Sequence, residues 1–323
     1  MDILAQIRKP VEKELQRFSS FYEIHLQHPN RLLQRALDHV RSRKGKLMRP
    51  ILTLLSAKRY GEIGDSVLHA AVSFEMLHNA SLIHDDVVDE SDRRRAQKSV
   101  NSLFDNKVAV LFGDYLLSTS LQHAAHTQNI QVVSRVASLG QTLSDGELLQ
   151  LSNLSSDEIS ENQCFDVIKG KTSALFAVCA SVGALLSGAN ADETDKMRCF
   201  GENIGYCFQI RDDIFDYFND NVGKPTGLDM KEGKLTLPVV HAVLQSNDDK
   251  WLKLALKVRA RQANDDEIAS LVQFTKTSGG IDYAFSKMEQ IRSRALSLLE
   301  PHLNDEIDHS LHLYLDFVLQ RNW

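Results

Sequence analysis

The strongest constraint on this chain is an acidic pattern, D-D-x-x-D, that occurs twice in segments whose apolar residues have helical spacing. The first copy spans residues 85–89 (DDVVD) and the second spans residues 212–216 (DDIFD), 127 positions later. Residues four apart share a helix face, so the outer acids of each copy are neighbours. One such copy is ordinarily a solvated helix face, but two copies among apolar neighbours indicate carboxylates that need cations. If the two helices face each other, six carboxylates converge on one cavity.

Helical spacing of apolar residues runs along almost the whole chain and predicts an all-α fold of roughly ten or more helices around a central cavity. The longest predicted helices span residues 65–89, 106–126, 165–188 and 198–218, and similar segments continue towards the C-terminus. No run of alternating β-branched residues predicts a sheet. The six prolines are scattered and no Ser/Gly tract marks a linker, so we expect a single domain over residues 1–323.

Composition narrows the partners and the compartment. With a formal net charge of −6, the chain is not expected to bind nucleic acid, and an anionic ligand must be held by local cations. The four cysteines have no CxxC spacing and are expected to be core residues in a reducing compartment, which favours a cytoplasmic location. The most apolar stretch, residues 174–189, is shorter than the ~20 residues that span a bilayer, so no transmembrane segment is expected.

The acids indicate the chemistry of the ligand. Clustered carboxylates select hard divalent cations such as Mg²⁺ or Mn²⁺, and Mg²⁺ completes its shell with water and phosphate oxygens. An acid-lined cavity therefore predicts a phosphorylated substrate, in particular a diphosphate. Residues 219–234 form a loop with three glycines and three lysines, as a functional lid often does. The basic candidates for phosphate contacts near these motifs are Lys46, Arg49, His78, Arg94, Arg95, Lys224 and Lys234.

Seven segments follow one another between about Lys44 and Pro238: KGKLMRP, EMLHNASLIHDDVVDESDRRR, VLFGDYLL, GELLQL, KGKTSALF, FQIRDDIFDYF and GKPTGLDMKEGKLTLP. This ordered series resembles the trans-isoprenyl diphosphate synthases of the polyprenyl synthetase family, in particular its long-chain, octaprenyl-type members. The resemblance implies an isoprenoid synthase fold, a homodimer and a Mg²⁺-dependent prenyltransferase. Its substrates would be isopentenyl diphosphate and an allylic diphosphate of the farnesyl or geranyl type.

The resemblance also implies roles for individual residues. Three Mg²⁺ ions, for which Mn²⁺ can substitute, would bridge the acids to the allylic diphosphate; their ligands would be Asp85, Asp89, Asp212 and Asp216, with Asp86 and Asp213 in second rank. The residues that would hold the allylic diphosphate are Arg94, Lys171, Lys224 and Lys234. Those that would hold isopentenyl diphosphate are Lys46, with its neighbour Gly45, and Arg49, His78 and Arg95. The catalytic candidates at the reacting carbons are Lys171, Thr172 and Gln209.

The implied reaction needs no side-chain nucleophile. The allylic C–O bond breaks, the alkene of isopentenyl diphosphate attacks the resulting cation, and a proton is lost to the departing diphosphate. Cations stabilise the charge of the leaving group, and apolar helix walls exclude water. In agreement, the sequence has no G-x-S-x-G motif and no cysteine in a reactive context.

The length of the product is predicted from the residues that precede the first acidic motif. One helical turn rises about 5.4 Å, roughly one extended isoprene unit. One turn before Asp85 stand the small residues Ala80 and Ser81, where an aromatic residue stops growth early in this family; Met76 and Leu77 lie deeper. Their sizes predict a long product, roughly C30–C40, of the kind used for quinone side chains. A shorter-chain geranylgeranyl or farnesyl diphosphate synthase is the alternative.

The sequence departs from the family pattern at two places. Lys44 replaces a glycine, Leu47 replaces an arginine, and residues 96–99 (AQKS) replace Gly-x-Pro-Thr, which affects the local loops. Three other functions are alternatives to a prenyltransferase. A terpene cyclase would carry a different second metal motif, with Asn, Ser and Glu. An HD-type phosphohydrolase, to which His84 next to Asp85 is similar, would need further His and Asp ligands. A non-catalytic synthase subunit would lack acids in one motif.

Overall fold

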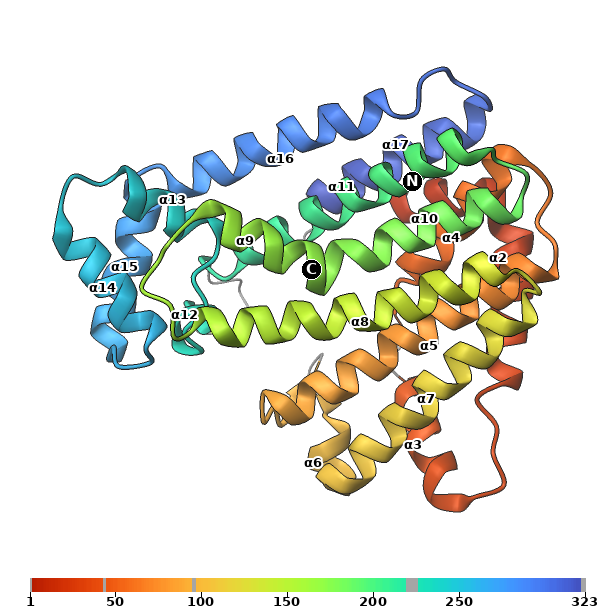
Figure 1. Cartoon of the computed structure of the whole chain (residues 1–323), viewed down its shortest axis with the longest axis horizontal. Coiled ribbons are helices and arrows are strands. Elements are labelled where there is room, and N and C mark those ends of the chain that lie inside the picture. The colour runs from red at the N-terminus through yellow and green to blue at the C-terminus, as the bar shows by residue number, and fades with distance from the viewer. Residues whose placement is uncertain (1, 43–44, 95–96, 219–225, 321–323) are drawn as a thin grey trace. The chain divides into compact units, whose positions relative to one another are not determined.

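The computed structural model describes residues 2–42, 45–94, 97–218 and 226–320. Arg95, Lys224 and residues 219–225 of the lid-like loop therefore lie outside the described residues, as do Lys44 and Ala96. The prediction of an all-α fold with ten or more helices is confirmed, since the described chain runs from helix α1 to helix α17 (Figure 1). The only strands among the described residues are β1 (Arg93–Arg94) and β2 (Gln97–Lys98), which pair antiparallel.

The α-helices of the N-terminal half are α1 (Ile3–Arg8), α2 (Glu12–Ile24), α3 (Arg31–Ser42), α4 (Met48–Tyr60), α5 (Asp65–Val88), α6 (Val100–Phe104), α7 (Asn106–His126) and α8 (Ile130–Asn153). A 3₁₀ turn, η1 (Lys9–Val11), follows α1. The later helices are α9 (Glu161–Ile168), η2 (Lys169–Ser173), α10 (Ala174–Leu186), α11 (Ala191–Phe215), α12 (Leu228–Lys231), α13 (Leu237–Gln245), α14 (Asp249–Arg259), α15 (Asp265–Thr277), α16 (Gly280–Ser297) and α17 (Asp305–Gln320).

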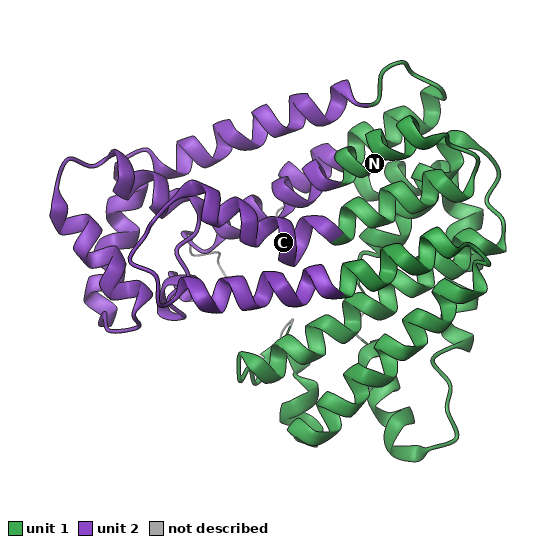
Figure 2. Ribbon diagram, in the orientation of Figure 1, with its two compact units in different colours: residues 1–140, 175–201, 299–314 green, residues 141–174, 202–298, 315–323 purple. Residues whose placement is uncertain are grey.

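The chain forms two compact units (Figure 2). The first comprises residues 1–140, 175–201 and 299–314, and the second comprises residues 141–174, 202–298 and 315–323. Helices α8, α11 and α17 each contribute residues to both units. The single domain expected from the sequence stays a prediction.

The first unit is built around α5, which lies beside α7 (orange and yellow in Figure 1). Helix α5 is apolar on nearly every side, and Phe74 and Met76 are fully buried, as expected of an interior helix. Two reciprocal hydrogen bonds hold α5 to α7: the Ser73 hydroxyl donates to the Ser120 carbonyl over 2.9 Å, and the Ser120 hydroxyl donates to the Ser73 carbonyl over 2.8 Å. These bonds fix the spacing of the two helices at one level.

The second unit contains an unusually close helix contact between α8 and η2. A Cβ built on Gly146 would lie 2.8 Å from the carbonyl carbon of Gly170, so the two backbones touch. The sequence predicted one continuous helix over residues 165–188, but the structure has a π-helix at Lys169–Ser173 in its middle. A π-helix inserts a residue into the turn and is frequent at functional sites. Here it carries two of the candidate residues, Lys171 and Thr172.

One helical run, Glu161–Leu186, is long and apolar enough to cross a membrane by length and composition alone. Of its most apolar window, 67% is buried inside the protein. Such burial is typical of a core helix, as the sequence predicted for residues 174–189.

Candidate active site

The first acidic motif lies at the C-terminal end of α5. Asp85 is in the last turn, and Asp89 is the C-cap residue, whose N–H donates to the Asp85 carbonyl over 2.8 Å. A helix C-terminus carries a partial negative charge, so carboxylates placed there are unfavourable unless a cation is near. This placement fits a cation-binding role for Asp85 and Asp89.

Asp86 differs from its neighbours because it is completely buried. Its Oδ1 accepts a 2.6 Å hydrogen bond from Nε of Arg94, whereas its buried Oδ2 has no hydrogen-bond partner among the described residues. Arg94 lies on β1, in the short hairpin that follows α5. Asp86 therefore positions Arg94, one of the cations predicted to hold the allylic diphosphate.

A cavity of about 350 Å³ in the first unit brings several predicted substrate-binding residues together. Gly45, His78 and Arg94 all line it. Lys46 lies between two lining residues, and its carbonyl accepts a 2.7 Å hydrogen bond from Arg8. Arg8 itself lines the cavity and was missed in the sequence, because it lies 38 residues before Lys46 and outside every recognised motif.

Arg49 and Leu47 show how the KGKLMRP segment is folded. Leu47 has left-handed backbone angles, with φ of 53°, and ends the segment that enters α4. Such a conformation is uncommon for a residue other than glycine, aspartate or asparagine. Two residues later the Arg49 guanidinium lies 5.1 Å from the centroid of the Phe176 ring. The departure of this sequence at Leu47 thus falls at a strained turn beside the predicted phosphate-binding residues.

The predicted chain-length residues lie on the buried part of α5. Met76 is fully buried, and Leu77 and Ala80 are each 3% exposed. Ser81 is half-buried, and its hydroxyl donates to the His78 carbonyl over 3.0 Å. These side chains therefore face the interior of the first unit, as a product-lining role requires.

His84 is held by packing against α7. Its Nε2 lies 3.2 Å from the Val110 carbonyl oxygen and 3.5 Å from a carboxylate oxygen of Asp114. A Cβ on Gly113 would come within 2.2 Å of the His84 ring, which explains the glycine in the VLFGDYLL segment. A histidine engaged in this way fits a packing role better than the metal-binding role of an HD-type phosphohydrolase.

The second acidic motif lies in the second unit, at the end of α11. Asp212 and Asp213 are in its last turn, and Asp216 follows the helix directly. The Asp216 carboxylate accepts hydrogen bonds from the backbone N–H groups of Leu228 (2.9 Å) and Asp229 (3.1 Å). It thereby anchors α12, while each oxygen keeps a lone pair for a cation. The role of Asp216 as a metal ligand stays a prediction.

The three catalytic candidates line one cavity of about 200 Å³ in the second unit. They also form a chain with the acidic motif: the Thr172 hydroxyl donates to Oε1 of Gln209 (2.8 Å), and Nε2 of Gln209 donates to Oδ1 of Asp213 (2.9 Å). Nζ of Lys171 forms a 2.6 Å ion pair with Glu147. The chain fixes the amide of Gln209 so that its oxygen faces the threonine.

Asp229 lies on α12, a short helix within the segment 219–234 that the sequence predicted as a loop, and was missed because that segment drew notice for its lysines. It lines the same cavity as Asp213 and Lys234. Burial, reinforced by the nearby Asp216, raises the pKa of Asp229 to about 7, although Lys234 acts against this rise. Burial and the charge of Asp229 likewise raise the pKa of Asp213. Buried carboxyl groups whose pKa is raised by burial and by neighbouring acids fit a site for divalent metal ions, because a bound cation would favour their charged form.

We expect Asp229→Asn to make the metal-free protein less sensitive to pH. An unfolded aspartate titrates near 3.9, so the folded protein holds an additional proton on Asp229 between that pH and about 7. Stability of the wild type should therefore fall as pH rises through this window, and by less in the variant. Melting temperatures at pH 5 and pH 7.5 in a chelator measure the effect.

Asp282→Asn, an exposed change on α16 of the same unit, is the matched control and should behave as the wild type. If Asp229→Asn also keeps the full pH dependence, the raised pKa is wrong.

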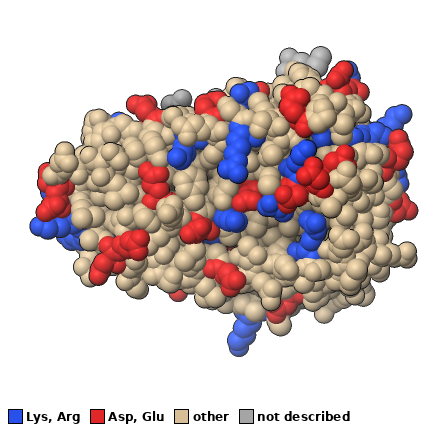
Figure 3. Space-filling view, turned by 45° about the horizontal axis from the view of Figure 1, so that its top comes forward, with Lys and Arg blue, Asp and Glu red and all other residues tan. Residues whose placement is uncertain are grey.

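The distribution of charged side chains over the surface bears on how an anionic ligand can be held. On the face drawn in Figure 3, acidic and basic side chains of the described residues are interspersed and leave no broad area of one sign. For an anionic ligand, the candidate cations are individual residues of the two cavities, such as Arg94, Lys171 and Lys234.

Comparisons with known proteins agree with this geometry. The model of the polyprenyl synthetase family matches residues 30–275. Octaprenyl diphosphate synthase of Haemophilus influenzae is 31% identical over 283 residues, 86% of this chain and 85% of that protein. A crystal structure of geranylgeranyl pyrophosphate synthase from Bacteroides thetaiotaomicron is 47% identical with a TM-score of 0.88, over 99% of this chain and 100% of that one. Polyprenyl synthase of Caulobacter crescentus, complexed with calcium and isoprenyl diphosphate, is 25% identical with a TM-score of 0.90, over 98% of both chains.

Proposed function

Because this chain belongs to the polyprenyl synthetase family and is a trans-prenyltransferase acting on isoprenyl diphosphates, we propose that it adds successive isopentenyl diphosphates to an allylic diphosphate in a Mg²⁺-dependent reaction. The observation that carries this proposal is the placement of both D-D-x-x-D motifs at helix C-termini, each beside a cavity with cationic side chains. Farnesyl or geranyl diphosphate is the proposed starter.

Divalent metal ions serve the enzymes of this family, and the acids of this chain fit them. The fit rests on the buried Oδ2 of Asp86, which has no hydrogen-bond partner among the described residues, and on the raised pKa values of Asp213 and Asp229, two buried carboxyl groups close to other acids. We propose Asp85, Asp89, Asp212 and Asp216 as the ligands of three Mg²⁺ ions, with Mn²⁺ as a substitute. Bound metal ions would supply Lewis-acid stabilisation of the diphosphate leaving group.

Side chains would bind the diphosphate and stabilise the carbocation in the proposed reaction. Arg94, held by Asp86, and Lys171 and Lys234, which line the second cavity, would donate to the oxygens of the allylic diphosphate as its C–O bond breaks. The hydrogen-bonded pair of Thr172 and Gln209 presents oxygen lone pairs, which favour a nearby carbocation. In this proposal the proton lost after the alkene attacks passes to the departing diphosphate.

Isopentenyl diphosphate would occupy the cavity of the first unit. Its diphosphate needs cations, and Arg8 and His78 lie around that cavity together with Gly45, while Arg94 at the same cavity stays assigned to the allylic diphosphate. Lys46 and Arg49 belong to the same segment and complete the proposed set. Arg95 and Lys224 remain part of the proposal through the family resemblance alone, because they lie outside the described residues.

For the product we propose a chain of roughly C30–C40, as used for quinone side chains. The support is the small size of Ala80 and Ser81 on the face of α5 that points into the protein. An octaprenyl synthase among the relatives agrees with this length.

Geranylgeranyl diphosphate, C20, is the second candidate, and a specific observation favours it. Ser73 precedes Asp85 by twelve residues, which is about 18 Å along a helix, or three to four isoprene units. Its reciprocal hydrogen bonds with Ser120 join α5 to α7 at that level and would end a passage that runs along α5. The structure that is 47% identical to this chain is of a geranylgeranyl pyrophosphate synthase.

A single assay tests the proposal. The purified protein alone should convert farnesyl and isopentenyl diphosphates into longer linear diphosphates in Mg²⁺, and a chelator should stop the reaction. The masses of the dephosphorylated products give the chain length directly. A cyclic hydrocarbon would instead identify a terpene cyclase, and activity that requires a second protein would identify a synthase subunit. Light scattering on the same sample tests the proposed homodimer. The location that we propose for the protein is the cytoplasm.

A further inference from the structure

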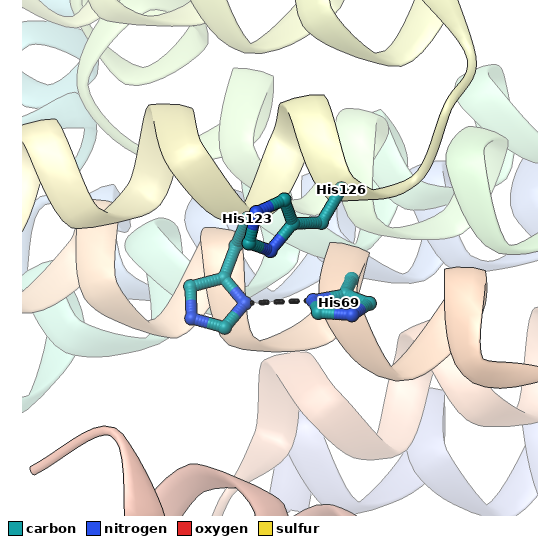
Figure 4. Close-up of side chains that lie close together, drawn as sticks. All are labelled: His69, His123 and His126. Carbon is teal, nitrogen blue, oxygen red and sulfur yellow. Dashed lines mark hydrogen bonds between the residues drawn. The ribbon is translucent and has the colours of Figure 1, made fainter.

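A cluster of histidines lies in the first unit, where α5 packs along α7. His69 is in the second turn of α5, and His123 and His126 are three residues apart at the end of α7. One ring nitrogen from each of the three histidines lies within 4.8 Å of the other two. Figure 4 shows the three rings gathered into one space from the two helices. Neither acidic motif contributes to this group.

The closest approach in the cluster joins two nitrogens. Nδ1 of His69 lies 2.9 Å from Nδ1 of His123. A neutral imidazole carries hydrogen on one nitrogen and a lone pair on the other, so only one of these two Nδ1 atoms holds a hydrogen. When that ring carries its hydrogen on Nε2 instead, the lone pairs of the two Nδ1 atoms point at the same place between the rings. A cation can then replace the shared hydrogen without any change in the net protonation of the rings.

The surroundings favour the neutral form of His69 and His123, which is the form of imidazole that binds metal ions. Burial, followed by the nearby His25, His69 and His126 rings, lowers the pKa of His123 to about 3. Burial and the His126 and His25 rings also lower the pKa of His69, against the opposite influence of Asp65. Neutral rings at physiological pH leave lone pairs free for a metal ion rather than for protons.

Aromatic side chains from α2 enclose one side of the cluster, and solvent reaches the other. The centroid of the Phe21 ring lies 4.8 Å from that of His69, and the centroid of the His25 ring lies 4.3 Å from that of His123. Nδ1 of His25 donates to the Phe21 carbonyl over 2.8 Å, which orients the ring. His123 is buried, whereas His126 is exposed and offers an entry path for an ion.

We propose that His69, His123 and His126 form a second metal site, which takes a first-row transition ion of the Zn²⁺ class. Imidazole nitrogens suit Zn²⁺, Ni²⁺ and Cu²⁺, whereas Mg²⁺ requires oxygen ligands, so the site is chemically distinct from the aspartate motifs. With Zn–N bonds of about 2.0–2.1 Å, tetrahedral ligands lie roughly 3.3 Å apart. The distances of 2.9 Å to at most 4.8 Å in the cluster bracket that value. Water would be the fourth ligand, and the ion would link α5 to α7.

Titration of the full chain with ZnCl₂ and with CoCl₂ tests this site. We expect one equivalent of Zn²⁺ to bind in excess Mg²⁺ and to raise the melting temperature by about 2–5 °C. Co²⁺ should give the intense visible bands of a four-coordinate ion, which octahedral oxygen sites do not give. His126→Ala removes an exposed ligand, so the fold should survive while affinity falls at least about tenfold. His69→Gln is a second variant with the same expected loss.

Two controls separate this site from the prenyltransferase site. His309→Ala removes an exposed histidine of α17, outside the cluster, and should bind Zn²⁺ as the wild type does. The double variant Asp85→Asn, Asp212→Asn loses proposed Mg²⁺ ligands but should keep the four-coordinate Co²⁺ spectrum. If the spectrum follows the aspartates, or if His126→Ala and His69→Gln both bind like the wild type, the proposal is wrong and the histidines only pack α5 against α7.

Discussion

Asp85→Asn is expected to lower the rate of isopentenyl diphosphate incorporation by at least about 10³-fold while the protein remains folded. The carboxylate lies in the last turn of α5, where the helix end adds negative charge and a cation is therefore most favourable. An amide keeps the shape of the side chain but removes the charge that binds Mg²⁺. Loss of Lewis-acid stabilisation costs several kcal/mol in the transition state, and each 1.36 kcal/mol is tenfold in rate. Asp212→Asn at the end of α11 should have a similar effect.

Matched controls exist on the same two helices. Asp65→Asn in the first turn of α5 and Asp192→Asn in the first turn of α11 make the same chemical change at exposed positions. Both should retain nearly full activity. Incorporation of labelled isopentenyl diphosphate at several Mg²⁺ concentrations measures the rates. An Asp85→Asn protein that turns over within tenfold of the wild type would remove Asp85 from the proposed metal ligands.

The second prediction with a large expected effect concerns the chain length of the product. We expect Ala80→Tyr to shift the main product to C15–C20 or shorter, because the new ring would fill the space one turn before Asp85. Ala80 is 3% exposed, so the ring must point into the protein, and some loss of stability from overpacking is expected. Mass analysis of the products, compared with the wild type under identical conditions, measures the shift.

Ser66→Tyr is the control, since it adds the same side chain to the first turn of α5, far from Asp85. It should leave the product length unchanged. The wild-type product decides what the serine pair does: a C20 product is expected if Ser73 and Ser120 end the passage, and a longer one if the chain passes them. Unchanged product length in Ala80→Tyr would contradict a role for this position.

Local patterns predicted the helices but not their irregularities. The apolar spacing of residues 65–89 predicts α5 almost to the residue, since it is observed at Asp65–Val88. No such pattern marks the π-helix at Lys169–Ser173, which lies against the backbone of Gly146, a residue more than twenty positions earlier. Periodicity reports which face of a helix is buried, and it carries no information about what lies against that face.

The candidate site was predictable where the sequence motif carried the chemistry. The acids at residues 85–89 and 212–216 stand out by spacing alone, whereas the hydrogen-bonded chain from Thr172 through Gln209 to Asp213 requires the fold. Asp229 was missed because a single acid in a loop has no signature. The histidine cluster was missed for a related reason: His69 and His123 are 54 positions apart and follow no metal-ligand spacing.

The contact between Gly146 and Gly170 limits how this sequence can change over generations. A methyl group at Gly146 would meet the backbone of Gly170, and a methyl group at Gly170 would lie 2.8 Å from the Cα of Gly146. Neither clash can be relieved by a side-chain rotation. Substitution of either glycine alone therefore requires the backbone to move. We therefore expect glycine at both positions to be retained together, and a homologue with alanine at one position should show a displaced helix at the other.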